Sequence, residues 1–165
     1  MTAVAKGLAA GLMSLAVWAG AAPGALCQDL KVVGLDGVEK TLSASAIKAL
    51  PRARAEVRWG EQASVYEGAK LAAVLRAAGV PVGARLHGDP LMAYVVAEGA
   101  DGFKAVYSLA EVDDAFHAGA TVLADTVDGR PLPDKQAPFR VVAAPDSKPW
   151  RSVHSVAKLT VKSAK

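Results

Sequence analysis

The sequence has little cysteine and few aromatic residues. Cys27 is the only cysteine in 165 residues, and Phe, Trp and Tyr together make up 5% of the chain. A single cysteine excludes an internal disulfide. The net charge of +3 is too small to indicate nucleic acid or anionic lipid as a partner. A length of 165 residues with 52% apolar side chains fits one globular domain.

Charged residues are also absent from one long stretch, Gly7 to Gln28. A single lysine precedes this stretch, and small residues and Pro23 follow its apolar centre at Gly7 to Gly20. This pattern is typical of a secretory signal peptide. We therefore expect residues 1–27 to be removed, leaving residues 28–165 as a periplasmic or secreted protein that makes no membrane contact after cleavage.

Two other roles for this apolar stretch are a membrane-anchoring helix and a lipid anchor on Cys27. A spanning helix needs about 20 apolar residues, but here glycine and proline are dense and no cationic stop follows. Leu26 stands where lipoprotein motifs have a small residue. Cleavage after Cys27 would leave a chain with no thiolate for catalysis or metal binding.

The remaining chain alternates short strand and helix patterns. Asp36-Gly37 between apolar runs predicts a hairpin over 30–42, and the spacing of Leu71, Val74, Leu75 and Ala78 predicts a helix. A capping box at 108–111 predicts a second helix that ends near residue 119. Further strands are expected over 55–59, 91–98, 103–107, 121–125, 139–143 and 153–161, with a short helix over 43–50. The sequence therefore predicts one α+β domain with short peripheral helices.

Several segments after residue 30 follow one another in a characteristic order and spacing. They are Tyr66–Val80, Ala100–Glu111, Leu123–Ala124, Asp128–Leu132 and Ala137–Pro145, followed by Lys148, Trp150–Arg151 and Val156. Together they resemble the sulfite-oxidase-type molybdopterin-binding domain in a small, stand-alone exported form. The resemblance covers nearly all of residues 28–165 and implies that family's mixed-sheet fold. It is also the only indication of molybdopterin as a cofactor.

Two features depart from the redox-active members of that family. The resemblance implies a cysteine ligand to molybdenum shortly after the strand at 55–59, where this chain has Trp59 or its neighbours, and Trp cannot ligate a metal. Exported members that carry the cofactor use a twin-arginine signal, and residues 1–6 contain no arginine. Both departures favour a non-catalytic role. An oxidoreductase that holds molybdopterin without a cysteine ligand is the alternative.

Five polar residues are candidates for the pocket in which the family holds its pterin phosphate. They are Arg58, His87, Arg140, Lys148 and Arg151. A guanidinium suits a phosphate because its planar fork can donate two parallel hydrogen bonds. The alternative is structural: Arg58 faces solvent, Arg140 begins a strand and the other three lie on loops.

The other polar residues indicate no catalytic or metal site. His87, His117 and His154 lack the spacing of a zinc site, and Asp113 and Asp114 are adjacent on a helix and point apart. The sequence therefore predicts a non-redox binding or accessory module for a small anionic ligand or an envelope protein partner. The alternatives are a molybdopterin-dependent oxidoreductase and a structural or sensor-associated interaction domain.

Overall fold

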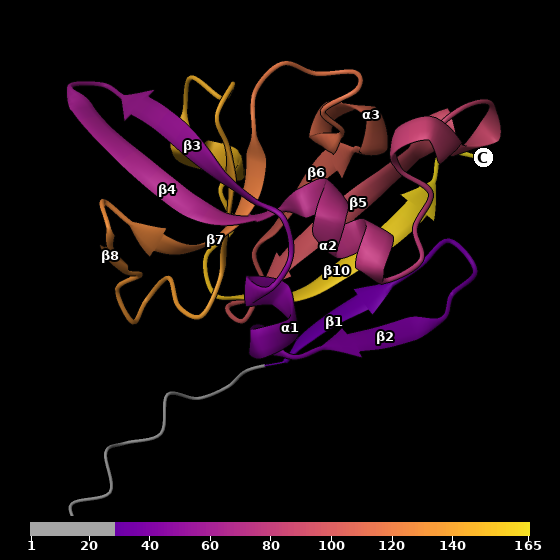
Figure 1. Ribbon diagram of the computed structural model, residues 1–165, viewed down its shortest axis with the longest axis horizontal. Helices are drawn as coiled ribbons and strands as arrows, with labels where there is room; N and C mark the ends of the chain where they lie inside the picture. Colours follow the sequence, from indigo (N-terminus) through magenta and orange to yellow (C-terminus); the bar gives the residue numbers. More distant parts are fainter. Residues whose placement is uncertain (1–28) are drawn as a thin grey trace, which may run out of the picture.

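Residues 29–165, which the computed structural model describes, form two β-sheets with short helices around them (Figure 1). The predicted signal peptide, its cleavage site and Cys27 lie outside the described residues. Within the described part of the chain, no helix is long and apolar enough to cross a membrane.

The first sheet has the strand order β2-β1-β10-β5-β6. Its strands are β1 (Leu30–Val33), β2 (Glu39–Leu42), β5 (Ala93–Gly99), β6 (Lys104–Ser108) and β10 (Val156–Ser163). Strands β1 and β10 pair in parallel, whereas the other neighbours are antiparallel, so the sheet is mixed. Side chains on β5 alternate strictly between buried and partly buried, as expected for a strand with one face on the core.

The second sheet has the order β3-β4-β7-β8, and β9 also pairs with β7. Its strands are β3 (Arg52–Trp59), β4 (Gln62–Lys70), β7 (Thr121–Val127), β8 (Arg130–Pro131) and β9 (Arg140–Ala143). Strands β4 and β7 approach closely at Gly68, where an added Cβ would lie 2.0 Å from the carbonyl oxygen of Leu123. A glycine is needed here because backbone fills the space that a side chain would occupy.

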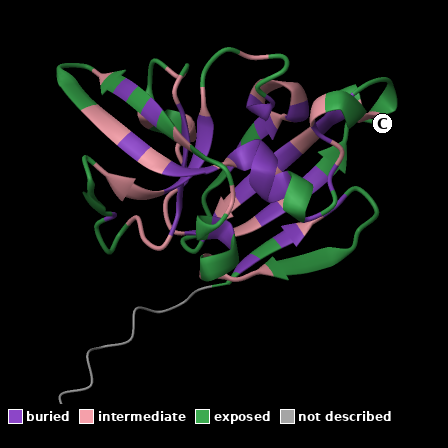
Figure 2. Cartoon of the chain, viewed as in Figure 1, coloured by how far each residue is buried: buried purple, intermediate pink, exposed green. Residues whose placement is uncertain are grey.

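Three α-helices of the described chain are short: α1 (Ala44–Lys48), α2 (Leu71–Ala77) and α3 (Leu109–Val112). The 3₁₀ turns are η1 (Gly83–Arg85), η2 (Asp89–Met92) and η3 (Pro149–Arg151). Helix α2 buries Leu71, Val74 and Leu75 in the larger core, together with residues of the first sheet. A smaller core lies in the second sheet. Figure 2 shows these buried positions in purple.

Helix α3, which Ser108 caps, is shorter than predicted. Its capping box is confirmed, but the helix ends at Val112 and not near residue 119. The buried carboxylate of Asp113 accepts hydrogen bonds from the backbone N–H groups of Gly83 and Ala115, while the Asp113 backbone is extended. These contacts tie the chain to η1 and stop the helix, so Phe116 is left 52% exposed.

Two strand predictions also need correction. Strand β4 was not expected, because the alternation of polar and apolar residues that begins at Gln62 is interrupted at Val65 and Tyr66. The last strand begins at Val156 and not at Val153, with a register shift between Val156 and Lys158. The hairpin at 30–42, the α1 and α2 helices and the mixed α+β architecture are confirmed.

Candidate functional site

An open pocket of about 540 Å³ lies between residues of the first sheet and residues of the second sheet. Strands β3 and β4, the β5–β6 turn, β9 and the segment around η3 all contribute to its walls. Its lining combines aromatic rings with ionisable groups and includes Trp59, Tyr66, Asp101, Phe103, Arg140 and His154. We refer to this space as the Arg140 pocket.

Strand pairing explains why one wall of the pocket belongs to the β3–β4 hairpin. Trp59 pairs with Gln62, Val57 with Ser64, and Ala55 with Tyr66. Because alternate residues of a strand share a face and paired residues lie side by side, these positions project from the same face of the hairpin. The hairpin therefore presents Trp59, Gln62, Ser64 and Tyr66 together.

Arg140 is buried, with 5% of its surface exposed. Among the described residues that line the pocket, no other charged residue is buried. Its Nε donates to Ser152 Oγ at 2.7 Å. Its Nη1 donates to Tyr66 Oη at 2.7 Å and to Gln136 Oε1 at 2.9 Å. The guanidinium carbon lies 5.1 Å from the Trp59 ring centre and 4.8 Å from that of Tyr66. Hydrogen bonds and aromatic faces thus fix the orientation of this cation.

None of these partners carries a negative charge. Within residues 29–165, no carboxylate lies in ion-pair distance of Arg140, and its Nη2 has no hydrogen-bond partner. Nη2 is not completely buried, because the completely buried side-chain atoms without a partner in the described chain do not include it. The pocket therefore holds an oriented cation with a free donor nitrogen.

Burial lowers the pKa of the Arg140 guanidinium, and interactions with Tyr66 and Tyr107 oppose that shift. Arginine nevertheless keeps its charge in proteins, because its ordinary pKa lies far above neutral pH. A buried charge without a counter-ion is unfavourable, and a bound anion would offset part of that cost. In electrostatic terms the pocket is suited to an oxyanion.

His154 is the second titratable group near this cation. Burial lowers the pKa of His154, the charge of Arg140 lowers it further, and Asp101 acts in the opposite direction. His154 consequently takes up a proton less readily than an ordinary histidine, which titrates near 6.5. Asp101 Oδ1 accepts the backbone N–H of Phe103 at 2.9 Å and so shapes the turn on the opposite wall.

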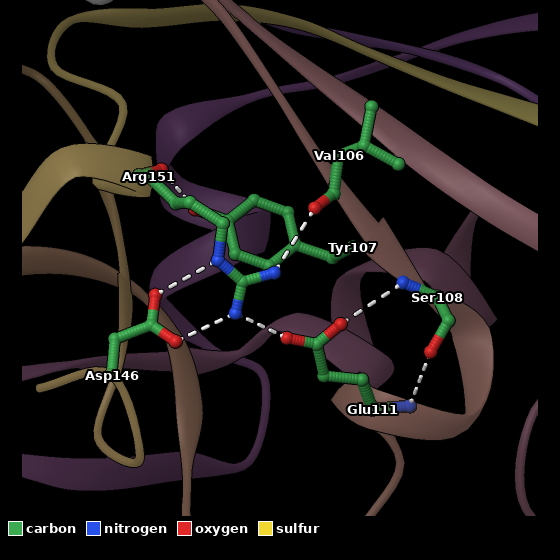
Figure 3. A network of polar contacts seen from close by, with 6 residues as sticks. All are labelled: Val106, Tyr107, Ser108, Glu111, Asp146 and Arg151. Carbon is green, nitrogen blue, oxygen red and sulfur yellow. Dashed lines mark hydrogen bonds and ion pairs between the residues drawn. The ribbon is translucent and has the colours of Figure 1, made fainter.

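Arg151 does not line the pocket, and each of its three guanidinium nitrogens has a hydrogen-bond partner (Figure 3). Its Nε and Nη2 donate to Asp146 at 3.1 and 2.6 Å, Nη2 donates to Glu111 Oε1 at 2.5 Å, and Nη1 donates to the Val106 carbonyl at 3.2 Å. Its guanidinium also lies 4.9 Å from the ring centre of Tyr107. These contacts join η3 to β6 and α3.

The other predicted site residues also lie outside the pocket lining. Arg58 is exposed on β3, on the face opposite Val57, and His87 is exposed between η1 and η2. Lys148 is exposed, with its Nζ 5.5 Å from the ring centre of Trp150, which is itself 76% exposed. Of the five residues predicted to share one pocket, the structure places only Arg140 there.

Several pocket residues were not found from the sequence. They are Trp59, Gln62, Ser64, Tyr66, Asp101, Phe103, Gln136, Pro149, Ser152 and His154. Recognising β4 would have shown the period-two series of residues 62, 64 and 66 opposite Trp59. Gln136 and Ser152, which bind Arg140, lie in irregular loops, where sequence periodicity gives no signal.

The donors in the pocket can be compared with the cofactor that the family resemblance implies. Arg140 and neighbouring hydroxyl and amide groups suit a phosphate or another oxyanion. Residues 28–165 contain no cysteine, and the described residues contain no cluster of three or more His, Cys, Asp or Glu side chains that could hold a metal. The residues present therefore do not fit a cysteine-ligated molybdenum centre.

Comparison with known proteins places the fold. No curated protein matches the sequence. Among solved structures, the sulfane dehydrogenase SoxCD from Paracoccus pantotrophus is similar, with a TM-score of 0.61 and 19% sequence identity. The match covers 81% of this chain but 38% of that one, so the likeness is to a part of the larger protein and concerns the fold. The model of the family called oxidoreductase molybdopterin binding domain matches residues 28–165, and the chain belongs to this family.

Proposed function

We propose that this protein is a non-redox binding module of the molybdopterin-binding-fold family, which takes a small anionic ligand in the Arg140 pocket. The observation that carries the proposal is the buried, oriented guanidinium that has no carboxylate partner within the described chain. Fold alone does not assign activity, so the proposal depends on this site and not on the family.

The position of Trp59 supports a role without molybdenum chemistry. The family resemblance places the metal-ligating cysteine near position 59, and here an indole stands in the pocket wall. Its ring lies 5.8 Å from that of Tyr66, and its Nε1 donates to the Asp146 carbonyl at 3.3 Å. An indole held in this way supplies apolar surface and no ligand to a metal.

Export is part of the proposal. The uncharged segment at 7–28 supports delivery to the periplasm or release from the cell, with residues 28–165 free of the membrane. Mass spectrometry of the protein from its own cells tests this point. A chain that begins at Gln28 supports export with cleavage, and a chain that retains the first residues contradicts it.

The anion site is tested by calorimetric titration of the purified protein with phosphate and sulfate. We expect saturable binding of at least one of them, reduced at least tenfold in Arg140→Met. Arg58→Met is the matched control, because Arg58 is an exposed arginine outside the pocket. Equal binding by Arg140→Met and the unmodified protein would refute the proposal, provided that circular dichroism shows both to be folded.

A second candidate function is recognition of an envelope protein, and one observation favours it. Trp150 is 76% exposed beside Lys148 in the η3 segment, and exposed aromatic residues of this kind are common at binding interfaces. Crosslinking in living cells through a photoreactive residue at position 150 tests it. A crosslinked protein lost on Lys148→Ala would support this function, and no crosslink would exclude it for this surface.

A further inference from the structure

The walls of the Arg140 pocket carry three aromatic rings. Trp59 and Tyr66 come from the β3–β4 hairpin of the second sheet, and Phe103 comes from the β5–β6 turn of the first sheet. The Arg140 guanidinium packs against the first two rings. The space therefore has aromatic surface contributed by both sheets and one cation.

The volume of the pocket exceeds the needs of a bare inorganic anion. That volume is about 540 Å³, and the pocket is open to solvent. Phosphate or sulfate has only four oxygens around one central atom and would leave most of this space to water. Pockets of roughly 300–1,000 Å³ are typical of organic ligands.

The backbone of Phe103 is held by hydrogen bonds although 44% of the residue's surface is exposed. Its backbone N–H donates to Asp101 Oδ1 at 2.9 Å, and its carbonyl accepts the N–H of Gly99 at 2.9 Å. Gly102, with a φ of 82°, allows the tight turn between them. A rigid turn that exposes a phenyl ring to a pocket is what an aromatic ligand would require.

The charges around the pocket set the charge of that ligand. Arg140 provides one positive charge and Asp101 provides one negative charge, whereas burial and the charge of Arg140 disfavour the protonated form of His154. The free donor of Arg140 is Nη2 alone, since Nε and Nη1 are already bonded to Ser152, Tyr66 and Gln136. One carboxylate satisfies this donor, whereas a dianionic phosphate ester would bring two negative charges into a pocket whose lining already includes the Asp101 carboxylate.

We infer that the ligand is a planar aromatic carboxylate, with its ring between Phe103 and the Trp59–Tyr66 pair and its carboxylate on Nη2 of Arg140. This inference rests on the anion-binding function proposed above and names its ligand class. Contacts between aromatic rings stabilise a complex beyond the burial of apolar area. With that burial, the ring should strengthen binding about tenfold or more.

The test compares three probes on the purified protein by calorimetric titration: acetate, benzoate and phenyl phosphate. We expect benzoate to bind at least tenfold more tightly than acetate and more tightly than phenyl phosphate. A Trp150→Phe variant leaves Trp59 as the tryptophan that responds among the described residues, and its fluorescence should change on addition of benzoate and not of acetate.

Two phenylalanine variants show where the ring binds. Phe103→Ala should reduce the preference for benzoate over acetate to about threefold or less. Phe116→Ala is the matched control, because Phe116 is similarly exposed and lies outside the pocket. It should keep the full preference. Both side chains are exposed, so both variants are expected to fold.

The ways in which the inference can fail are distinguishable. Equal, Arg140-dependent binding of benzoate and acetate would overturn the inference and leave the anion-binding function standing. Tighter binding of phenyl phosphate than of benzoate would overturn the choice of a carboxylate. If none of these probes binds, and neither phosphate nor sulfate binds, both the inference and the proposed function are wrong.

Discussion

Replacing Arg151 with methionine should destabilise the protein without affecting the Arg140 pocket. Methionine keeps much of the apolar stem of arginine and removes its charge. The change breaks ion pairs with Asp146 and Glu111 and a hydrogen bond to the Val106 carbonyl. These contacts hold η3 to the edge strand β6 and to α3, as Figure 3 shows.

The exposure of these side chains sets the magnitude. The Arg151 side chain is 41% exposed, so solvent screens its interactions, whereas the side chains of Asp146 and Glu111 are only 19% and 27% exposed. Exposed ion pairs contribute about 0–1 kcal/mol each, and the carbonyl bond and the cation–π contact with Tyr107 contribute about 1 kcal/mol each. We expect a loss of about 2–4 kcal/mol in the free energy of unfolding, or about 6–15 °C in Tm.

Urea unfolding followed by circular dichroism measures this loss. Arg58→Met is the control, because Arg58 is exposed and forms no ion pair within residues 29–165, and its effect should stay within about 0.5 kcal/mol. Anion binding by Arg151→Met should equal that of the unmodified protein. A loss no larger than that of Arg58→Met would refute the stabilising role of the network, and a loss of anion binding would refute the assignment of the pocket to Arg140.

Three further predictions concern separate parts of the fold. Gly68→Ala should cost at least about 2 kcal/mol in urea unfolding, because its Cβ would meet backbone atoms of β7, which cannot move aside; an effect below about 0.5 kcal/mol would contradict the close approach of the strands. The imidazole of His154 should titrate below pH 6.5 in an NMR titration, since burial and Arg140 lower its pKa, and Arg140→Met should raise that pKa. Between the lowered pKa and 6.5 the unfolded chain binds more protons at His154 than the folded one, so this group makes stability fall as pH falls through that window; an unperturbed titration would refute the contact. Ser108→Ala should cost about 1 kcal/mol by removing the cap of α3, again measured by urea unfolding, and no change would show that the short helix does not depend on its capping box.

Local sequence signals predicted the elements that depend on local chemistry. The hairpin around Asp36-Gly37, the helix ended by Gly79 and the capping box at Ser108 all form as expected. Each of these depends on contacts between residues close in the sequence. The end of α3 could not be predicted in the same way, because Asp113 stops it by bonding to Gly83, 30 residues earlier.

The same distinction applies to the candidate site. The sequence predicted five basic or histidine residues for a phosphate pocket. Of these, Arg140 lines the pocket, and the fold places the other four elsewhere. Arg151 and Arg140 are alike in sequence terms, since each is an arginine near a strand in the last third of the chain. What separates them is their surroundings in space: Arg151 contacts two carboxylates, and Arg140 contacts hydroxyl, amide and aromatic groups.

We propose that this domain uses its family's fold to bind an anionic ligand without molybdenum chemistry. Elemental analysis of the protein purified from its own cells tests this claim most directly, with the protein concentration measured on the same sample. Because residues 28–165 supply no thiolate, we predict molybdenum far below one equivalent per chain. Molybdenum near one equivalent would contradict the claim.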